Sequence, residues 1–535
     1  MSEASEEPWD VIVVGSGLVG GTSAWTLCQR GLRVLLLEAG PLAPRALSGT
    51  QEPGSIGNLV WRARASLGGQ YVQARTNSFK PQVAHLYVND WQNPYTTPAK
   101  RPFLWFRGRQ VGGRGRLWGR LCYRMSDLDF AGASRDGIGH DWPIRYADLE
   151  PYYQRLEQFM RVEPPYPASN GAHAATEGAF SKAEIQFAQR VSEKWPERKL
   201  EAPHVSRIDD AEHSLTIDAA LPSGLLTLRP NTVVAKVLTD RASGRATGVE
   251  CIDTVTKERR TIRGKCIILN ASTIETLRIL WNSPSPTHDG SLGNAQDLLG
   301  RNLMDNCGVL VVGLNAEPPA AAHDKEHADG QHDPARAHGF YIPRYQNIDR
   351  AEATFKRGFG VQGGIGRDTA FWYMFAFGEM LPSPTNRVTL SKRRRDAWGI
   401  PAAHIDVEFG ENDRRMIERM ESDVRAMATA AGLTVRESPS RGRLLGFILK
   451  SAMKAVQSRP GVFHPGGAIH EAGGAPMGDS PANSVVNAHN QLWECPNVLV
   501  SDGACFTSGG NVSPTLTMMA IAARAAEFAA TLVRD

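Results

Sequence analysis

The sequence predicts an α/β protein with two parts: a discontinuous Rossmann-like domain and a second domain built on an antiparallel sheet with helices. A strand–turn–helix–strand pattern over residues 9–41 and a returning buried apolar run at 266–269 predict the first domain. Strand-like runs between residues 339 and 410, such as 370–377 and 386–390, predict the antiparallel sheet. A chain of 535 residues is long enough for both domains.

The stretch from Trp9 to Pro41 contains each part of a dinucleotide-binding unit. A buried apolar run leads directly into Gly15-Ser-Gly17-Leu-Val-Gly20, a helix-length segment follows, and a second apolar run ends at Glu38. In such a unit Gly15 allows a tight turn, Gly17 lets the backbone approach a pyrophosphate at the helix N-terminus, and Gly20 lets helix and strand pack closely. Glu38 would accept hydrogen bonds from an adenosine ribose. The residues therefore predict a bound dinucleotide, either NAD or FAD, rather than a glycine-rich turn of an ordinary α/β unit.

Composition and charge narrow the class of protein. Lys and Arg number 60 against 56 Asp and Glu, and the net charge of +4 is too balanced for a nucleic-acid-binding surface. The seven cysteines have neither CxxC spacing nor the density of a disulfide framework, which indicates a reducing compartment. The acidic N-terminus lacks a signal-peptide pattern, and no uncharged apolar run is long enough to cross a bilayer. We therefore expect a cytoplasmic protein without a membrane span, periplasmic only if an exported partner subunit carries it.

The two strand-rich parts of the nucleotide-binding unit are far apart in the sequence, so the domain that they build is discontinuous. We assign residues 8–165, 215–310 and 462–535 to this domain. Residues 166–214 and 311–461 then form the substrate-binding domain.

A low-complexity stretch within the second domain, at about residues 316–338, contains few bulky apolar side chains, so we expect a mobile loop there. His323 and His327 stand four positions apart in this stretch, a spacing that could bind zinc on a helix. Because no third ligand lies nearby in a helical frame, we predict no metal site.

Six blocks of sequence resemble the glucose–methanol–choline (GMC) oxidoreductase family and occur in the family's order. They are GSGLVG with LLLEAGP, VGGRGRLWGRLCYRMSDLDF, DWPIRYADLEPYY, LPSPTNRVTLS, HEAGGAPMGDSPANSVVN and NVLVSDGACFTSGGNVSPTLTMMAIAARAAEF, spread from residue 9 to residue 528. The GGRGRLWGR and HEAGGAPMG blocks are most similar to the bacterial sugar-oxidising branch, which includes pyranose-oxidase-like and glycoside 3-oxidising members.

The resemblance implies that the dinucleotide is FAD. The residues that match the family's cofactor site are Gly15, Gly17, Gly20 and Glu38 for the ADP half, Val234 for the adenine through its backbone, Gly112 and Gly113 along the pyrophosphate and flavin, Asp502 and Gly503 at the ribityl–phosphate end, and Pro514 and Thr515 at the start of a helix that faces the flavin. Leu117 stands where some pyranose oxidases carry a histidine that binds FAD covalently. Leucine has no nucleophilic atom, so we expect non-covalent FAD.

Oxidation of an alcohol by hydride loss requires a base for the hydroxyl proton, and histidine suits this role because its unperturbed pKa is about 6.5. The resemblance places the base at His470, which opens the HEAGGAPMG block, and His464 is the reserve candidate. Sugar-oxidising members have an asparagine immediately before the Pro-Thr of the last motif, paired with the catalytic histidine. This chain has Ser513 at that position and Asn511 two residues earlier. Either Asn511 reaches the site, which we slightly favour, or Ser513 acts with a shorter side chain.

The leading interpretation is an FAD enzyme that oxidises a secondary hydroxyl (C2 or C3) of a pyranose sugar or glycoside to a ketone by hydride transfer to flavin N5. The electrons would pass to O2, or to a quinone or cytochrome partner, and the assembly is left open between a homo-oligomer and a complex with a small accessory subunit. The alternatives are a GMC-fold lyase with structural FAD, and a catalytically silent partner or binding subunit. Reduction of the flavin by a substrate without oxygen would distinguish the first interpretation from the other two.

Overall fold

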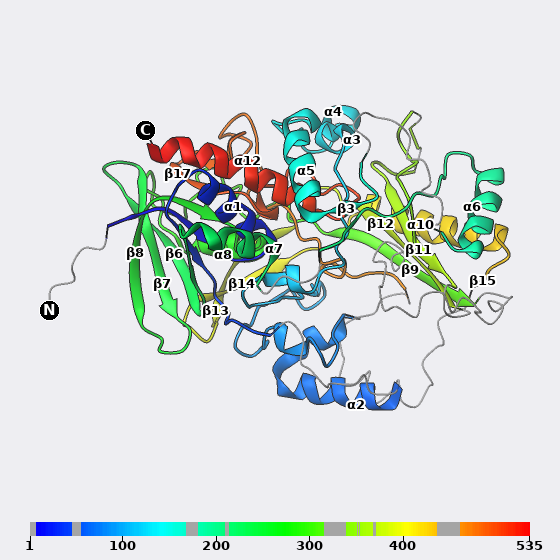
Figure 1. Ribbon diagram of the computed structural model, residues 1–535, viewed down its shortest axis with the longest axis horizontal. Helices are drawn as coiled ribbons and strands as arrows, with labels where there is room; N and C mark the ends of the chain where they lie inside the picture. The colour runs from blue at the N-terminus through cyan, green and yellow to red at the C-terminus, as the bar shows by residue number, and fades with distance from the viewer. Residues whose placement is uncertain are drawn as a thin grey trace.

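The computed structural model describes residues 7–44, 55–76, 78–166, 180–208, 213–314, 339–349, 351–352, 354–366, 371–435 and 461–534. These residues form an elongated molecule with a sheet toward each end (Figure 1). The predicted loop at 316–338 lies outside the described residues, so its mobility stays a prediction.

The first sheet contains eight strands among the described residues. They are β1 (Trp9–Val14), β2 (Val34–Leu37), β5 (Leu226–Arg229), β6 (Thr232–Asp240), β7 (Arg245–Asp253), β8 (Arg259–Leu269), β16 (Gln491–Leu492) and β17 (Cys495–Val500). Their order is β16-β17-β8-β1-β2-β5, with β6 and β7 joined through β8. β1 pairs in parallel with β2 and β8, so that Val14 lies level with Leu37 and Leu269. The predicted returning strand is therefore β8, and its continuous apolar end is typical of a strand buried on both faces.

Helices α1 (Leu18–Gln29), α8 (Thr273–Asn282) and α12 (Thr515–Arg534) pack against this sheet. Helix α7 (Leu215–Ala220) packs on α1, and α5 (Tyr146–Met160) packs on α12. Val11 and Val13 of β1 belong to a core with α1 and the end of α12, whereas Ile12 and Val14 belong to the larger core that contains α8. This division follows from the alternation of side chains along a strand.

The last helix, α12, begins where the sequence predicts a helix after Pro514. By length and composition it is apolar enough to cross a membrane, and 61% of its most apolar window is buried inside the protein. It lies along α1 and α5 (Figure 1).

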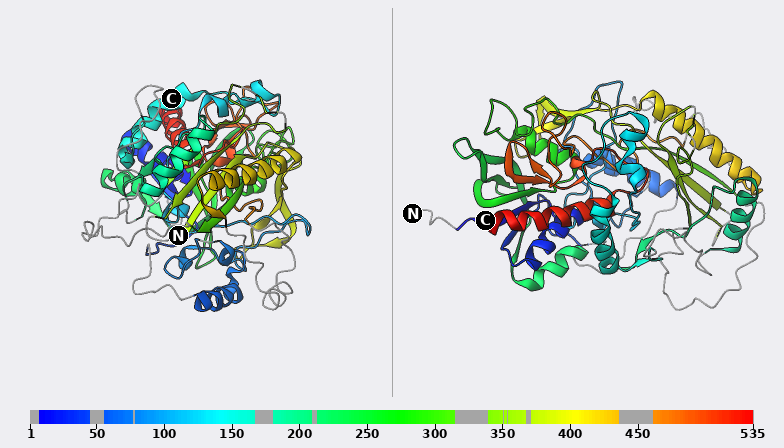
Figure 2. Two further views of the ribbon diagram at one scale, coloured as in Figure 1. Left: turned by 90° about the vertical axis from the view of Figure 1, so that its right-hand side faces the viewer. Right: turned by 90° about the horizontal axis from the view of Figure 1, so that it is seen from above.

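The second sheet is antiparallel, as predicted. Its strands are β9 (Asn306–Leu314), β10 (Phe340–Ile342), β11 (Phe359–Ile365), β12 (Phe371–Glu379) and β15 (Thr434–Val435), in the order β10-β11-β12-β9-β15. Helix α10 (Glu411–Ala430) covers β9 and β12, and α6 (Lys182–Lys194) packs beside it (Figure 2). The second sheet is thus covered by helices on one face.

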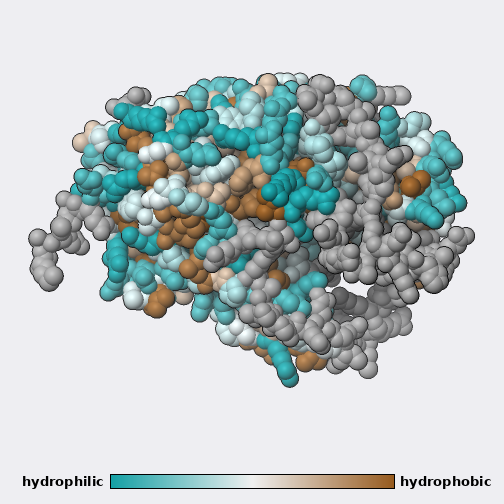
Figure 3. All heavy atoms as spheres, in the orientation of Figure 1, coloured by the Kyte–Doolittle hydropathy of each residue, from teal (hydrophilic) through white to brown (hydrophobic). Residues whose placement is uncertain are grey.

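The remaining elements are shorter or stand apart from the two sheets. The predicted strand at 386–390 forms β13 (Arg387–Arg395), which pairs with β14 (Pro401–Asp406) as a separate hairpin on α8 rather than joining the second sheet. Short elements are α3 (Asp127–Phe130), α4 (Gly132–Asp136), β3 (Val162–Glu163) and β4 (Val205–Ser206). Helix α2 (Ser55–Ala65) stands out from the body, at the lower edge of the molecule (Figure 1). Its Leu59 and Val60 are exposed. Some hydrophobic atoms appear at the lower edge of the surface in the same orientation (Figure 3).

Candidate active site

A cavity of about 610 Å³ runs between the two sheets. One end is lined by the turn after β1, by β6 and by the start of α8, and the other end by β11, β12 and the loop that carries His470. The residues predicted from the sequence that line it are Gly15, Gly17, Glu38, Gly113, Val234, His470, Asp502, Gly503, Ser513, Pro514 and Thr515. Gly20, Gly112 and Asn511 do not line it. The structure therefore brings residues from the whole length of the chain to one cavity.

The glycine-rich turn has the shape that its sequence predicts. Gly15 has a φ of +97°, and a Cβ there would lie 2.3 Å from the carbonyl oxygen of Asn270. A Cβ on Gly20 would lie 1.8 Å from the carbonyl oxygen of Gly15, so helix and turn are in direct contact. In contrast, a Cβ on Gly17 would meet no atom within 4 Å, and no side chain caps the start of α1. The backbone N–H groups at the start of α1 are therefore open to an anion such as a pyrophosphate.

Glu38 lies at the end of β2 and lines the cavity. Its carboxylate accepts hydrogen bonds from the Ser16 N–H (3.1 Å), the Ser16 hydroxyl (2.6 Å) and the Gly40 N–H (2.8 Å). Burial raises the pKa of Glu38, and these donors together with the positive charge of Arg109 act against that rise. Glu38 thus connects the glycine turn with the segment after β2, while its oxygens remain acceptors for a ligand.

The middle of the cavity is also formed by backbone and by Asp502. Gly113 approaches the glycine turn so closely that its Cβ would lie 3.0 Å from the Cα of Gly17. Asp502 accepts hydrogen bonds from the Thr276 hydroxyl (2.6 Å) and the Ala504 N–H (3.0 Å), and burial raises its pKa to about 6. Leu117 lines the same cavity. An open helix start, close glycine backbones and an acidic group at the strand end fit FAD, and these residues would hold it.

His470 lies at the other end, part-exposed to the cavity and otherwise surrounded by protein. Its Nδ1 atom is 2.7 Å from the Oδ1 atom of Asn306, the first residue of β9, and its ring centroid is 5.9 Å from that of Phe377. Burial, together with the nearby positive charge of Arg114, lowers the pKa of His470 to about 4. The imidazole is therefore neutral at pH 7 and able to accept a proton.

The loop before His470 is held in an unusual backbone conformation. Ile469 has a φ of +64°, which costs a residue with a side chain about 1–2 kcal/mol. The Asp305 carboxylate accepts the N–H groups on either side of it, from Ala468 (3.2 Å) and His470 (2.9 Å). Burial and the negative charge of Glu471 raise the pKa of Asp305 to about 7. Asp305 thus fixes the loop that presents the histidine.

Two further charges adjoin this loop, and sequence reasoning missed both. Arg114 forms a 2.7 Å ion pair with the buried Glu471 and also donates to the Ile469 carbonyl oxygen (3.3 Å). Arg114 lines the cavity. Its position in the second glycine-rich block is the one sequence signal that could have drawn attention to it.

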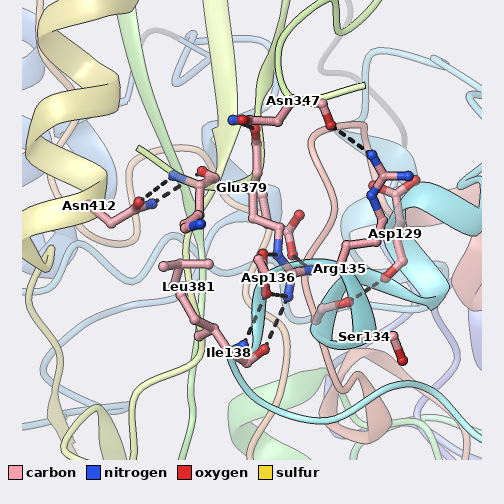
Figure 4. A network of polar contacts seen from close by, with 12 residues as sticks. Asp129, Ser134, Arg135, Asp136, Ile138, Asn347, Glu379, Leu381 and Asn412 are labelled. Atoms are coloured by element: carbon pink, nitrogen blue, oxygen red, sulfur yellow. Dashed lines mark hydrogen bonds and ion pairs between the residues drawn. The ribbon is translucent and has the colours of Figure 1, made fainter. Parts of the chain in front are cut away.

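Buried charged side chains adjoin the paired strands β9 and β12 at the end where Asn306 lies. Glu379 is the cross-strand partner of Asn306 on β12 and is fully buried. It forms a 3.1 Å ion pair with Arg357, which also bonds Asp136 at 2.5 Å (Figure 4). Burial raises the pKa of Glu379 to about 7, and the charge of Arg357 opposes that shift. These charges hold the end of β12, with which the start of β9 is paired.

Ser513 and Asn511 occupy different places. Ser513 lines the cavity, in the register that the family's asparagine would have. Asn511 is 7% exposed, and its Nδ2 atom is buried without a hydrogen-bond partner among the described residues. His464 does not line the cavity, and burial lowers its pKa.

The wall opposite the cofactor end is aromatic. Tyr373, Phe375 and Phe377 follow one another on one face of β12 and line the cavity together with Gln362, the cross-strand neighbour of Phe375. Trp372 points the other way and is fully buried, as the alternation of a strand requires. The period-two pattern in residues 371–377 could have identified this wall, whereas the contact between Asn306 and His470 has no signal in the sequence.

No group of three potential metal ligands occurs within the described ranges. His323 and His327 lie outside those ranges. The absence of a metal site stays a prediction.

Comparisons with known proteins identify a family for this chain. Two models, both described as GMC oxidoreductase, match residues 9–307 and 382–522. The chain is 27% identical to 2-methyl-1,2-propanediol dehydrogenase of Mycolicibacterium austroafricanum, over 98% of this chain and 95% of that protein. It is 24% identical to C-glycoside 3-oxidase of Microbacterium trichothecenolyticum, over 97% of this chain and 96% of that protein.

The fold is similar to that of a formate oxidase from Aspergillus oryzae, which was studied for FAD modification, with a TM-score of 0.65 and 15% identity over 98% of this chain and 99% of that one. The matched models cover most of the sequence, and the cavity has the residues that a dinucleotide requires. The protein therefore belongs to the GMC oxidoreductase family, and it is an FAD-dependent oxidoreductase.

Proposed function

We propose that the protein oxidises a secondary hydroxyl, at C2 or C3, of a pyranose sugar or glycoside to a ketone, with His470 as the general base. The observation that carries this proposal is the position of His470, neutral and part-exposed at the cavity end where an aromatic wall faces it. A neutral imidazole at the end of a cavity suits removal of a hydroxyl proton.

The chain's residues divide the chemistry. Bound FAD would accept the hydride that leaves the carbinol carbon. His470 takes the hydroxyl proton, which makes loss of the hydride favourable because the oxygen electrons then form the carbonyl bond. Ser513, in the lining beside it, offers a hydroxyl that can donate to or accept from a second substrate hydroxyl. The aromatic wall excludes water from the reacting carbon.

The wall also supports the substrate class. A pyranose has flat faces of C–H groups and an edge of hydroxyls, so it can lie on an aromatic ring and hydrogen-bond at its rim. Phe375 and Phe377 supply the rings, and Gln362 and Tyr373 supply polar atoms at the edge of the same surface. The C-glycoside 3-oxidase among the relatives acts on substrates of this kind, whereas the diol dehydrogenase acts on a smaller alcohol.

The acceptor of the electrons is a separate part of the proposal. One of the two relatives is named a dehydrogenase and the other an oxidase. The electron acceptor that we propose is therefore O2, a quinone or a cytochrome partner. We infer a cytoplasmic location, with export only alongside a partner subunit that carries a signal.

Anaerobic mixing of the purified flavoprotein with free pyranoses, O-glycosides, C-glycosides and 2-methyl-1,2-propanediol tests the proposal. We expect a sugar or glycoside to bleach the flavin faster than the diol, and the product to be a ketone by mass spectrometry. Faster reduction by the diol, or turnover of a substrate while the flavin stays oxidised, would overturn it. Admission of O2 or of a quinone to the reduced enzyme then identifies the acceptor by the rate at which the yellow colour returns.

A further inference from the structure

The inference concerns Asn306, a buried side chain with 2% exposure at the start of β9. Its Nδ2 group donates one hydrogen bond to the Gly378 carbonyl oxygen (3.0 Å) and one to the Gly510 carbonyl oxygen (2.8 Å). Both N–H bonds of the amide are therefore used. The Oδ1 atom, which can only accept, lies 2.7 Å from His470 Nδ1.

The opposite orientation of the amide is unfavourable. It would place Oδ1 against two carbonyl oxygens and would lose two buried hydrogen bonds. Because Oδ1 faces the imidazole, Nδ1 must carry the proton. In the neutral ring, Nε2 is then the unprotonated nitrogen, and no hydrogen bond occupies it within the described part of the chain. The geometry thus selects one of two tautomers, the one that leaves Nε2 as the base.

We propose that Asn306 is a positioning residue, which sets the tautomer and the ring orientation of His470 and so makes Nε2 the atom that accepts the substrate proton. This inference rests on the proposed function, because it needs His470 to be the base. Asp305 and Asn306 then act as a pair: Asp305 holds the backbone on either side of Ile469, and Asn306 holds the ring. Adjacent residues at one strand end thereby fix both the loop and the imidazole.

Asn306 also connects the parts that must stay in register. Gly378 belongs to β12, the strand of the aromatic wall, and Gly510 belongs to the segment that leads to Ser513. One amide therefore holds the base, the substrate wall and the last motif in a single arrangement. An alanine at this position would break all three contacts without adding a clash.

The test is anaerobic stopped-flow reduction of the flavin by the best substrate, for Asn306→Ala, His470→Ala and the double variant. We expect Asn306→Ala to slow reduction by about 10- to 100-fold, the range seen when the hydrogen-bond partner that orients a metal-bound histidine is removed. The double variant should be no slower than His470→Ala, because we attribute the effect of Asn306 on the rate to the ring and not to its contacts with Gly378 and Gly510. Asn386→Ala is the matched control: Asn386 is equally buried and makes two hydrogen bonds, but with the backbone of Glu408 away from the cavity. The flavin of Asn386→Ala should be reduced at the wild-type rate.

A second variant gives an independent readout. In Asn306→Asp one carboxylate oxygen still accepts from Nδ1–H, whereas the other faces the Gly378 and Gly510 carbonyl oxygens and loses both hydrogen bonds, so only part of the rate should return. A carboxylate favours the imidazolium, so the acid limb of the rate profile should move to higher pH relative to wild type, in which Arg114, Asp305 and Glu471 adjoin the same loop.

The outcomes separate the two claims. A wild-type rate for Asn306→Ala, a loss of equal size in the His470→Ala background, or an unshifted profile for Asn306→Asp would overturn the inference and leave His470 as the base. A wild-type rate for His470→Ala would instead overturn the proposed mechanism itself.

Discussion

The two ends of the cavity are built in different ways. The nucleotide end consists mainly of backbone: Gly15 and Gly17 lie in the turn after β1, Gly20 lies in the first turn of α1, and the ligand site exists because side chains are absent there. The catalytic end consists of side chains that lie far apart in the sequence, with His470 held by Asn306. The first end is therefore sensitive to added atoms, whereas the second is sensitive to lost hydrogen-bond partners.

The largest expected effect lies at the catalytic end. His470→Ala should slow flavin reduction by about 10²–10⁴-fold, which corresponds to about 3–5 kcal/mol, because no base remains for the hydroxyl proton. Bound FAD, measured by absorbance per protein, should be unchanged, since the nucleotide end does not use this residue. A near wild-type rate would move the role to another group, with His464 as the first candidate.

The pH dependence of flavin reduction in the wild-type protein also tests whether His470 is the base. The pKa of His470 is lowered to about 4, so the base is already neutral well below pH 6.5. The rate of flavin reduction should therefore fall only as the pH approaches 4, and His470→Ala should lack that acid limb. A limb near pH 7 would instead indicate control by Asp305, whose pKa is raised to about 7.

At the nucleotide end, two glycines form a matched pair. Gly20→Ala would place a Cβ 1.8 Å from a backbone oxygen, so it should destabilise the protein by about 3 kcal/mol or more and prevent FAD binding. The Cβ added by Gly17→Ala would meet no atom within 4 Å, so the free energy of unfolding should change by about 1 kcal/mol or less. The affinity for FAD should fall, because the added methyl group lies on the cavity lining. Thermal unfolding measures the stability of each variant, and flavin content per protein measures its FAD binding. Equal behaviour of the two variants would contradict the close packing of α1 on the turn.

A smaller effect distinguishes Ser513 from Asn511. Only Ser513 lines the cavity, so Ser513→Ala should slow flavin reduction by about 10-fold, the value of one hydrogen bond in the transition state, and Asn511→Ala should slow it less. The comparison is made with the same substrate at saturation. The opposite order would support the role that the sequence suggests for Asn511.

The smallest expected change concerns the link to FAD. Leu117 lines the cavity and offers no nucleophilic atom, so acid precipitation should leave all the yellow colour in the supernatant. Colour in the pellet would show that another side chain forms a covalent bond with the flavin.

The sequence by itself determined most of the nucleotide end. The apolar runs before and after the glycine turn, the acidic residue at the end of β2 and the returning strand β8 are local patterns, and local patterns are enough because the site is made of backbone geometry. The same holds for the antiparallel sheet, whose alternating residues in β12 are visible in the sequence. The strand predicted at 386–390 was placed less well, since periodicity shows that a strand exists but not which sheet it joins.

Only the tertiary structure decided the catalytic end. Asn306 and His470 are separated by 164 positions, and nothing in either segment indicates that the amide of one fixes the ring of the other. The low pKa of His470 and the high pKa of Asp305 also arise from burial and from charges on other segments. Long-range contacts set both properties, and a local pattern cannot encode which distant group a side chain will meet.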